Sequence, residues 1–132
     1  MTQTIDKILE SADSNLSLLK TLADNSFDSI LMTDASAQGK ITYANKAFKK
    51  LTGYEPTEVI GKTPRILQGQ GTDEKVIRRL AEALQAGKKF EGKAINYKKD
   101  GTPFIMFWRV VPVKSKGKIN AWIAIQREGS AI

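Results

Sequence analysis

The chain is organised around the stretch Gly61-Lys62-Thr63-Pro64-Arg65-Ile66-Leu67-Gln68-Gly69-Gln70-Gly71-Thr72-Asp73. It separates two predicted halves of a sheet, and its glycines give backbone freedom where side chains would obstruct. Arg65 and Gln68 are three residues apart, so a single helical turn places both on one side. An arginine can hold an anion, and an amide can both donate and accept hydrogen bonds. The stretch therefore indicates either a site for a planar polar ligand or a solvated surface loop.

The elements that flank this stretch predict an α+β domain. The segments before it predict a hairpin, a helix capped by Asn45, and a short helix that begins at Pro56. The segments after it predict a longer helix capped by Thr72 or Asp73, followed by a three-stranded meander. The expected ranges are 29–45 for the hairpin, to about 86 for the longer helix, and 90–98, 103–114 and 119–127 for the strands. Together they predict one five-stranded antiparallel sheet with helices over one face.

The first residues predict an amphipathic helix over residues 3–23. Its apolar residues repeat at steps of four and three, as in a coiled-coil seam, which consists of Ile5, Leu9, Ala12, Leu16, Leu19 and Ala23. Such a wide apolar face needs a partner. We therefore divide the chain into an N-terminal helix at residues 1–25 and a domain at 26–130. We expect a homodimer that pairs through the helix and the sheet.

Composition excludes several classes of function. The 132 residues suit a single domain with its own core. The chain has no cysteine and no histidine, which excludes disulfides, thiol or imidazole catalysis, and imidazole-bound zinc or haem. No nucleophile–base pair is apparent, so we do not expect an enzyme. No loop clusters carboxylates at calcium-binding spacing, so we do not expect a metal site. With no apolar run near the roughly 20 residues of a membrane span, and no signal-like N-terminus, we expect a cytoplasmic protein without membrane contact.

The net charge of +7 raises the question of a nucleic-acid partner. Most of the later lysines fall at predicted strand ends and turns, where charge also keeps sheet edges from pairing. Few aromatic residues interleave with them in the way a base-stacking surface requires. We therefore expect no binding of nucleic acid.

Strand alternation turns an unusual set of side chains toward the helices. Asn96 shares a face with small residues on the first late strand, and Gln126 does so on the last strand. Met106 and Trp108 frame the same face from the middle strand. A buried amide without partners costs about 1–3 kcal/mol. Either the two amides bond to backbone and helix side chains fill the space, or a ligand satisfies them.

Four motifs follow one another along the chain: Ile41-Thr42-Tyr43-Ala44-Asn45, Leu51-Thr52-Gly53-Tyr54, Val59-Ile60-Gly61-Lys62-Thr63-Pro64-Arg65 and Tyr97-Lys98-Lys99-Asp100-Gly101. Through these motifs, residues 27–128 resemble a PAS domain. PAS domains are sensory and interaction modules built on a five-stranded antiparallel sheet, which matches the order of elements predicted above.

Within the PAS family, the chain is most similar to the flavin-binding light-oxygen-voltage (LOV) group. The signature lies in Arg65-Ile66-Leu67-Gln68-Gly69, with further matches at Ile95-Asn96-Tyr97 and Ile125-Gln126. The resemblance implies that Arg65 meets the flavin phosphate and that Gln68, Asn96 and Gln126 face the polar edge of the ring. We expect Asn45, Met106 and Trp108 to complete the site for FMN or FAD.

This chain departs from the LOV pattern at four positions. Pro64 stands where the group has its photoreactive cysteine, and Thr63 where an asparagine precedes it. Met106 replaces a second ring-reading asparagine, and Ala81 replaces a second phosphate-binding arginine. The resemblance thus implies a flavin held without a cysteinyl adduct, in a sensor that reports redox state or light.

Two alternatives stay open. One is a cofactor-free PAS domain that works by dimerisation, with the pocket closed by Ile66, Met106 and Trp108. The other is a PAS domain for another small organic ligand. In each case the chain is either free-standing or part of a larger signalling protein with its own effector domain.

Overall fold

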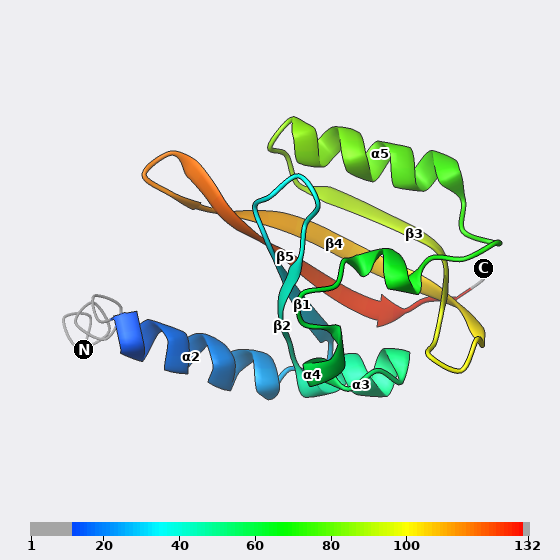
Figure 1. Ribbon diagram of the computed structural model, residues 1–132, viewed down its shortest axis with the longest axis horizontal. Helices are drawn as coiled ribbons and strands as arrows, with labels where there is room; N and C mark the ends of the chain where they lie inside the picture. The colour runs from blue at the N-terminus through cyan, green and yellow to red at the C-terminus, as the bar shows by residue number, and fades with distance from the viewer. Residues whose placement is uncertain (1–11, 131–132) are drawn as a thin grey trace.

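The computed structural model describes residues 12–130, with side chains from Leu16 onward. The elements in chain order are α2 (Ala12–Asp24), β1 (Ser29–Asp34), β2 (Ile41–Ala44), α3 (Lys46–Thr52), α4 (Pro56–Val59), the 3-10 helix η1 (Pro64–Leu67), α5 (Glu74–Gln85), β3 (Phe90–Tyr97), β4 (Pro103–Ser115) and β5 (Lys118–Glu128) (Figure 1). They form one antiparallel sheet with helices, which confirms the predicted α+β fold. No helix within residues 12–130 is both long enough and apolar enough to cross a membrane.

The sheet has the strand order β2-β1-β5-β4-β3. The early hairpin joins the late meander where β1 pairs with β5, and this register sets Ser29 opposite Gln126. On the other side of β5, Gln126 stands opposite Trp108 of β4. Gln126 is therefore held between two neighbouring strands.

Strand alternation separates a buried inner face from an outer face, as predicted. On β3 the residues Phe90, Ala94 and Asn96 are buried, whereas Glu91 and Lys93 are exposed. On β4 the buried set is Phe104, Met106, Trp108 and Val110. The helices cover this inner face, where alternate side chains bury apolar area.

The core is closely packed where α3 and α4 meet the sheet. Phe48 of α3 and Val59 of α4 are each 0% exposed. In contrast, no residue of α5 is buried, although its apolar face packs against the core through Val76, Leu80 and Leu84. The apolar side of α5 is thus separated from full contact with the sheet.

The predicted caps position these helices. The side chain of Asn45 accepts a hydrogen bond from the backbone N–H of Phe48 at the start of α3. Gly53, with φ of 82°, ends that helix in the left-handed region that glycine adopts without strain. Asp73 caps α5 by accepting from the N–H of Lys75.

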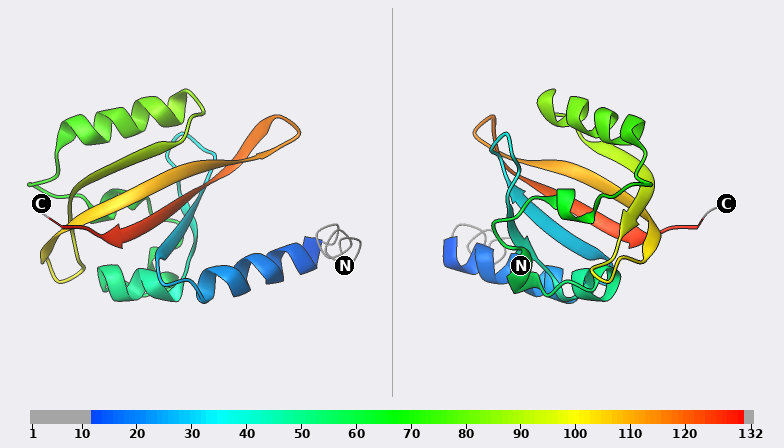
Figure 2. Two further views of the ribbon diagram at one scale, coloured as in Figure 1. Left: turned by 180° about the vertical axis from the view of Figure 1, so that it is seen from behind. Right: turned by 45° about the vertical axis from the view of Figure 1, so that its right-hand side comes forward.

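Helix α2 extends away from the rest of the domain (Figure 2). Its Leu16 and Leu22 side chains are 53% and 64% exposed. Its C-terminal end is held by Tyr43, whose hydroxyl donates to Asp24 at 2.7 Å. Residues 3–11 of the predicted helix, with Ile5 and Leu9, lie outside the described residues, and the domain boundary after residue 25 stays a prediction.

Candidate functional site: a cavity beneath helix α5

A cavity of about 610 Å³ lies between α5 and the inner face of the sheet. This volume falls within the range of about 300–1,000 Å³ that is typical of small-molecule sites. Its apolar lining includes Leu80, Leu84, Trp108, Val110, Trp122 and Ala124. The rings of Trp108 and Trp122 line the space without filling it. The cofactor-free alternative instead required side chains to close this pocket.

The 3-10 helix η1 places two predicted site residues at this cavity. Pro64 begins η1, and the 2% exposed side chain of Leu67 anchors it to the core. A 3-10 helix has three residues per turn, so Arg65 and the residue that follows η1, Gln68, lie on one side. Both line the cavity, as the three-residue spacing predicted.

Within the described residues, two buried amides carry polar atoms that have no hydrogen-bond partner. Gln126 lines the cavity and is 3% exposed, and its Oε1 accepts from the Ser29 hydroxyl at 3.0 Å. Asn96 is 5% exposed and does not line the cavity. Within residues 12–130, neither its amide nor the Nε2 of Gln126 makes a hydrogen bond. In the same part of the chain, every fully buried side-chain nitrogen or oxygen does have a partner. These free atoms therefore keep contact with open space, although their residues are almost completely buried.

The charge of the cavity comes from Arg65. Among the described residues that line the cavity, Arg65 is the only charged one, and it is exposed. Ala81 lines the cavity where the resemblance placed a second arginine. Arg79 does not replace it, because its guanidinium lies 5.4 Å from the centroid of the Phe90 ring. The cavity thus offers a mainly apolar space, amides, and one cation for an anionic group.

The turn between β1 and β2 forms another part of the wall through Ser36 and Gln38. The Asp34 carboxylate organises this turn, since it accepts from the Ser36 hydroxyl at 2.6 Å and from the Lys40 backbone N–H at 3.0 Å. The Ser36 hydroxyl is the largest of the influences that hold the pKa of Asp34 below its usual value. The turn is therefore ordered by its own hydrogen bonds.

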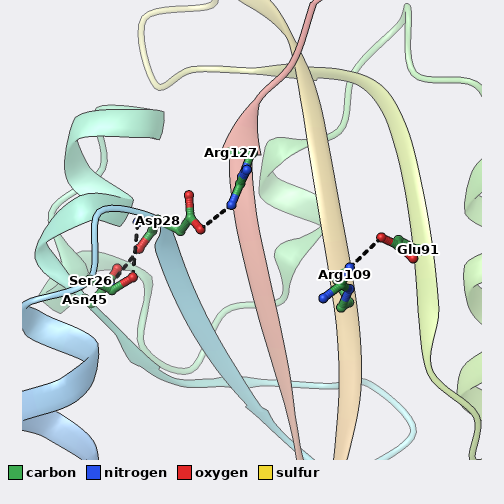
Figure 3. Close-up of polar contacts among 6 residues, drawn as sticks. All are labelled: Ser26, Asp28, Asn45, Glu91, Arg109 and Arg127. Atoms are coloured by element: carbon green, nitrogen blue, oxygen red, sulfur yellow. Dashed lines mark hydrogen bonds and ion pairs between the residues drawn. The ribbon is translucent and has the colours of Figure 1, made fainter.

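Asn45 and Met106 do not line the cavity. Asn45 is 0% exposed, and its side chain bonds to the backbone N–H groups of Ile30 and Phe48 and the carbonyl oxygens of Ala23 and Asp28. Figure 3 shows the contact with Asp28. It joins α2, β1 and α3 and has no bonding capacity left for a ligand. Met106 is 2% exposed within the core cluster. We therefore leave both residues out of the candidate site, while Trp108 stays in it.

Sequence reasoning missed Ser29, which fixes one atom of the Gln126 amide. The contact depends on the pairing of β1 with β5, across 97 residues of sequence. Nothing local in the sequence marks that pairing. The wall residues Ser36 and Gln38 were also missed, because a polar turn is ordinarily interpreted as a solvated connection.

Comparison with known families supports the interpretation of this geometry. Residues 28–130 match the family described as PAS domain. Phototropin-2 of Oryza sativa subsp. japonica is 40% identical over 91 residues, which cover 68% of this chain and 10% of the phototropin. A blue-light-activated histidine kinase of Brucella anthropi is 44% identical over 87 residues, which cover 65% of this chain and 18% of the kinase. The chain therefore spans a small part of these relatives.

Solved structures resemble the whole domain. A light-oxygen-voltage domain studied with a flavin analogue has a TM-score of 0.79 and 29% identity, over 87% of this chain and 86% of that one. The LOV domain of the blue-light activated histidine kinase from Erythrobacter litoralis EL346 has a TM-score of 0.73 and 29% identity, over 76% of this chain and 94% of that one.

Proposed function

Because this chain belongs to the PAS domain family and is a sensory signalling module of the LOV type, we propose that its cavity binds a flavin, FMN or FAD, without a covalent bond. The observation that carries the proposal is the pair of nearly buried amides, Asn96 and Gln126, because within residues 12–130 the Asn96 amide and the Nε2 of Gln126 make no hydrogen bond. A bare amide in such a place is costly unless a ligand pairs with it. A flavin ring offers both donors and acceptors along one edge.

Each residue of the proposed site has a role in holding such a ligand. Gln126 has its Oε1 occupied by Ser29, which leaves its Nε2 to donate to a carbonyl of the ligand. Asn96 and Gln68 offer a donor and an acceptor each. Trp108 and Trp122 supply flat apolar surface that excludes water. Arg65, at the exposed end, attracts the phosphate.

The module works without a thioether link, because the chain contains no cysteine and Pro64 lines the cavity where the LOV group places one. A bound flavin supplies absorption of blue light and reversible exchange of electrons. We assign the protein's part to Gln126, whose amide would sense any change in the hydrogen-bonding of the ring. The output is then a change in that amide rather than a covalent adduct.

A continuous set of contacts leads from Gln126 to helix α2. Ser29, bonded to Gln126, follows Asp28 in the chain, and the Asp28 carbonyl oxygen accepts from the Asn45 amide at 3.0 Å. The same amide donates to the Ala23 carbonyl oxygen of α2 at 2.6 Å. Arg127, next to Gln126, donates to the Asp28 carboxylate at 2.7 Å (Figure 3). We propose this route as the link between the cavity and the N-terminal helix.

The partner we propose is a second copy of the chain. On the outer face of the sheet, Phe107 is 40% exposed and Ile95 is 38% exposed. On α2, the exposed leucines are Leu16, Leu18, Leu19 and Leu22. Of the charges beside Phe107, Arg109 is bonded to Glu91 at 2.8 Å and Arg127 to Asp28 at 2.7 Å (Figure 3), whereas Lys93, opposite Phe107, has no ion pair among the described residues. An apolar surface on which two of the cations are paired suits contact between identical faces. A change at α2 would then alter the arrangement of the dimer, and through it an effector in a larger signalling protein.

Dimer formation is tested by analytical ultracentrifugation of Phe107→Glu, which places a charge on the apolar outer face. The matched control is Ile60→Glu, because Ile60 is 49% exposed on the loop that follows α4. We expect the first variant to become monomeric and the control to remain dimeric. A monomeric wild type, or a Phe107→Glu variant that still dimerises, contradicts the proposed interface.

Flavin binding is tested by titrating the ligand-free protein with FMN, FAD and riboflavin while following flavin fluorescence. Gln68→Leu should weaken binding, whereas Gln70→Leu, an exposed amide in the same loop, should not. If the wild type binds none of the three compounds, the flavin proposal fails and the cofactor-free dimerisation module takes its place. If Gln68→Leu and Gln70→Leu behave alike, the flavin lies elsewhere.

A further inference from the structure

The loop that follows η1 is fastened to β3 by hydrogen bonds that do not involve the cavity. The backbone N–H of Gly71 donates to the Tyr97 hydroxyl oxygen at 2.7 Å. The Thr72 hydroxyl donates to the Ile95 carbonyl oxygen at 2.7 Å and accepts from the Gly69 backbone N–H at 3.0 Å. We call these five residues the Tyr97 latch.

Within the latch, the Tyr97 side chain packs directly against the backbone of Gly69 and Gly71. A Cβ atom added at Gly69 would lie 2.4 Å from a carbon of the Tyr97 ring. A Cβ added at Gly71 would lie 2.7 Å from the Tyr97 hydroxyl oxygen. Real Cβ atoms do not approach so closely, so the ring rests directly on backbone that only glycine leaves free. The glycines of this loop are thus explained by contact with Tyr97.

The latch brackets one amide of the cavity wall and one amide of β3. Gln68 immediately precedes Gly69, and Asn96 stands between Ile95 and Tyr97. The hydrogen bonds therefore act on the residues next to each amide, on the loop and on the strand. Tyr97 itself does not line the cavity.

We propose that Tyr97 and Thr72 are positioning residues that set the relative placement of the Gln68 and Asn96 amides, and so the recognition of the ring edge. This inference rests on the proposed flavin site. Recognition of a planar edge by two amides requires each to be held within about 0.5 Å, which side chains on a free loop do not achieve. The latch supplies that restraint from the side of β3 that faces away from the cavity.

The test uses Tyr97→Phe and Thr72→Val, which remove hydroxyl groups and keep the shape of the side chains. The matched control is Tyr43→Phe, which removes a hydroxyl hydrogen bond of equal length, 2.7 Å, at the base of α2. Two readouts are needed: the Kd for FMN, and the side-chain amide signals of Gln68 and Asn96 in ¹H–¹⁵N spectra of the ligand-free protein. The second readout reports placement of the amides whether or not a flavin binds.

We expect both latch variants to shift or broaden the Gln68 and Asn96 amide signals and to raise the Kd for FMN by about tenfold or more. Tyr43→Phe should lower thermal stability and leave both readouts unchanged. Unmoved amide signals in Tyr97→Phe and Thr72→Val overturn the inference, as does an unchanged Kd. If the wild type binds no flavin while the latch variants still move the amide signals, the flavin proposal fails and the positioning role stands.

Discussion

Replacing Asn96 by leucine should move protein stability and flavin binding in opposite directions. Asn96 is 5% exposed, and its amide has no hydrogen-bond partner within residues 12–130. In the ligand-free protein this amide has lost most of its water and gained no protein contact in exchange. A leucine of similar length would remove that cost and add apolar contact with its neighbours on the inner face.

The expected magnitudes follow from the burial. An unpaired buried polar group costs about 1–3 kcal/mol, and the exposed fraction that Asn96 keeps places it at the low end. We expect Asn96→Leu to stabilise the ligand-free protein by about 1 kcal/mol, which raises Tm by roughly 3–5 °C in a chain of this size. Loss of a donor and an acceptor toward the flavin, each contributing about 0.5–1.5 kcal/mol, weakens binding by roughly 5- to 150-fold.

The assay pairs thermal unfolding of the ligand-free protein with fluorescence titration of FMN. The control is Asn120→Leu, because Asn120 is an exposed asparagine on β5. It should raise neither Tm nor the Kd for FMN. The reasoning would be refuted if Asn96→Leu had a lower Tm than the wild type and bound FMN equally well. The amide of Asn96 in the wild type would then be satisfied without a ligand.

Four further outcomes are expected. Asn45→Ala should destabilise the fold by about 2–4 kcal/mol in urea denaturation, because it leaves four backbone groups unpaired, yet it should leave the Kd for FMN within about twofold. Arg65→Ala should weaken the binding of FMN more than that of riboflavin, because Arg65 is the charged residue among the described residues of the cavity lining. The difference should shrink as the salt concentration rises. Equal losses of affinity for both ligands would rule out a phosphate contact. Gly69→Ala should lower stability by about 1–3 kcal/mol, since its Cβ would meet the Tyr97 ring; a neutral effect would show that the ring is free to move. Burial and the hydrogen bond to Asp24 raise the pKa of Tyr43 above its usual value near 10, so that contact stabilises the fold below about pH 10 and is lost as pH rises further; stability of the wild type should fall more steeply than that of Tyr43→Phe above that pH.

The elements of this fold were predictable because their signals are local. Alternation on β3 identified Asn96 as an inward residue, and the structure confirms it as buried. The spacing of Arg65 and Gln68 predicted a shared side, which η1 provides. Asn45 was correctly predicted as a helix cap. Each of these inferences depends on a few neighbouring residues and on backbone geometry that does not vary between folds.

The remaining features depend on contacts between distant segments. The bond from Ser29 to Gln126 exists because β1 inserts beside β5, which no spacing in the sequence encodes. The latch between Tyr97 and Gly71 likewise spans 26 residues. The apolar pattern of α5 predicted a packed face, yet no residue of α5 is buried, because periodicity shows which side faces the sheet and not how far away it lies. The cavity is a consequence of that distance.

The central claim is that the side-chain amides of Gln68, Asn96 and Gln126 bind the edge of a flavin ring, and a crystal structure of the protein loaded with FMN tests it most directly. We predict a ring inside the cavity, with Gln68, Asn96 and Gln126 at hydrogen-bonding distance from its polar edge and Arg65 near the phosphate. A flavin bound outside the cavity, or a ring whose polar edge faces away from these amides, would contradict the claim.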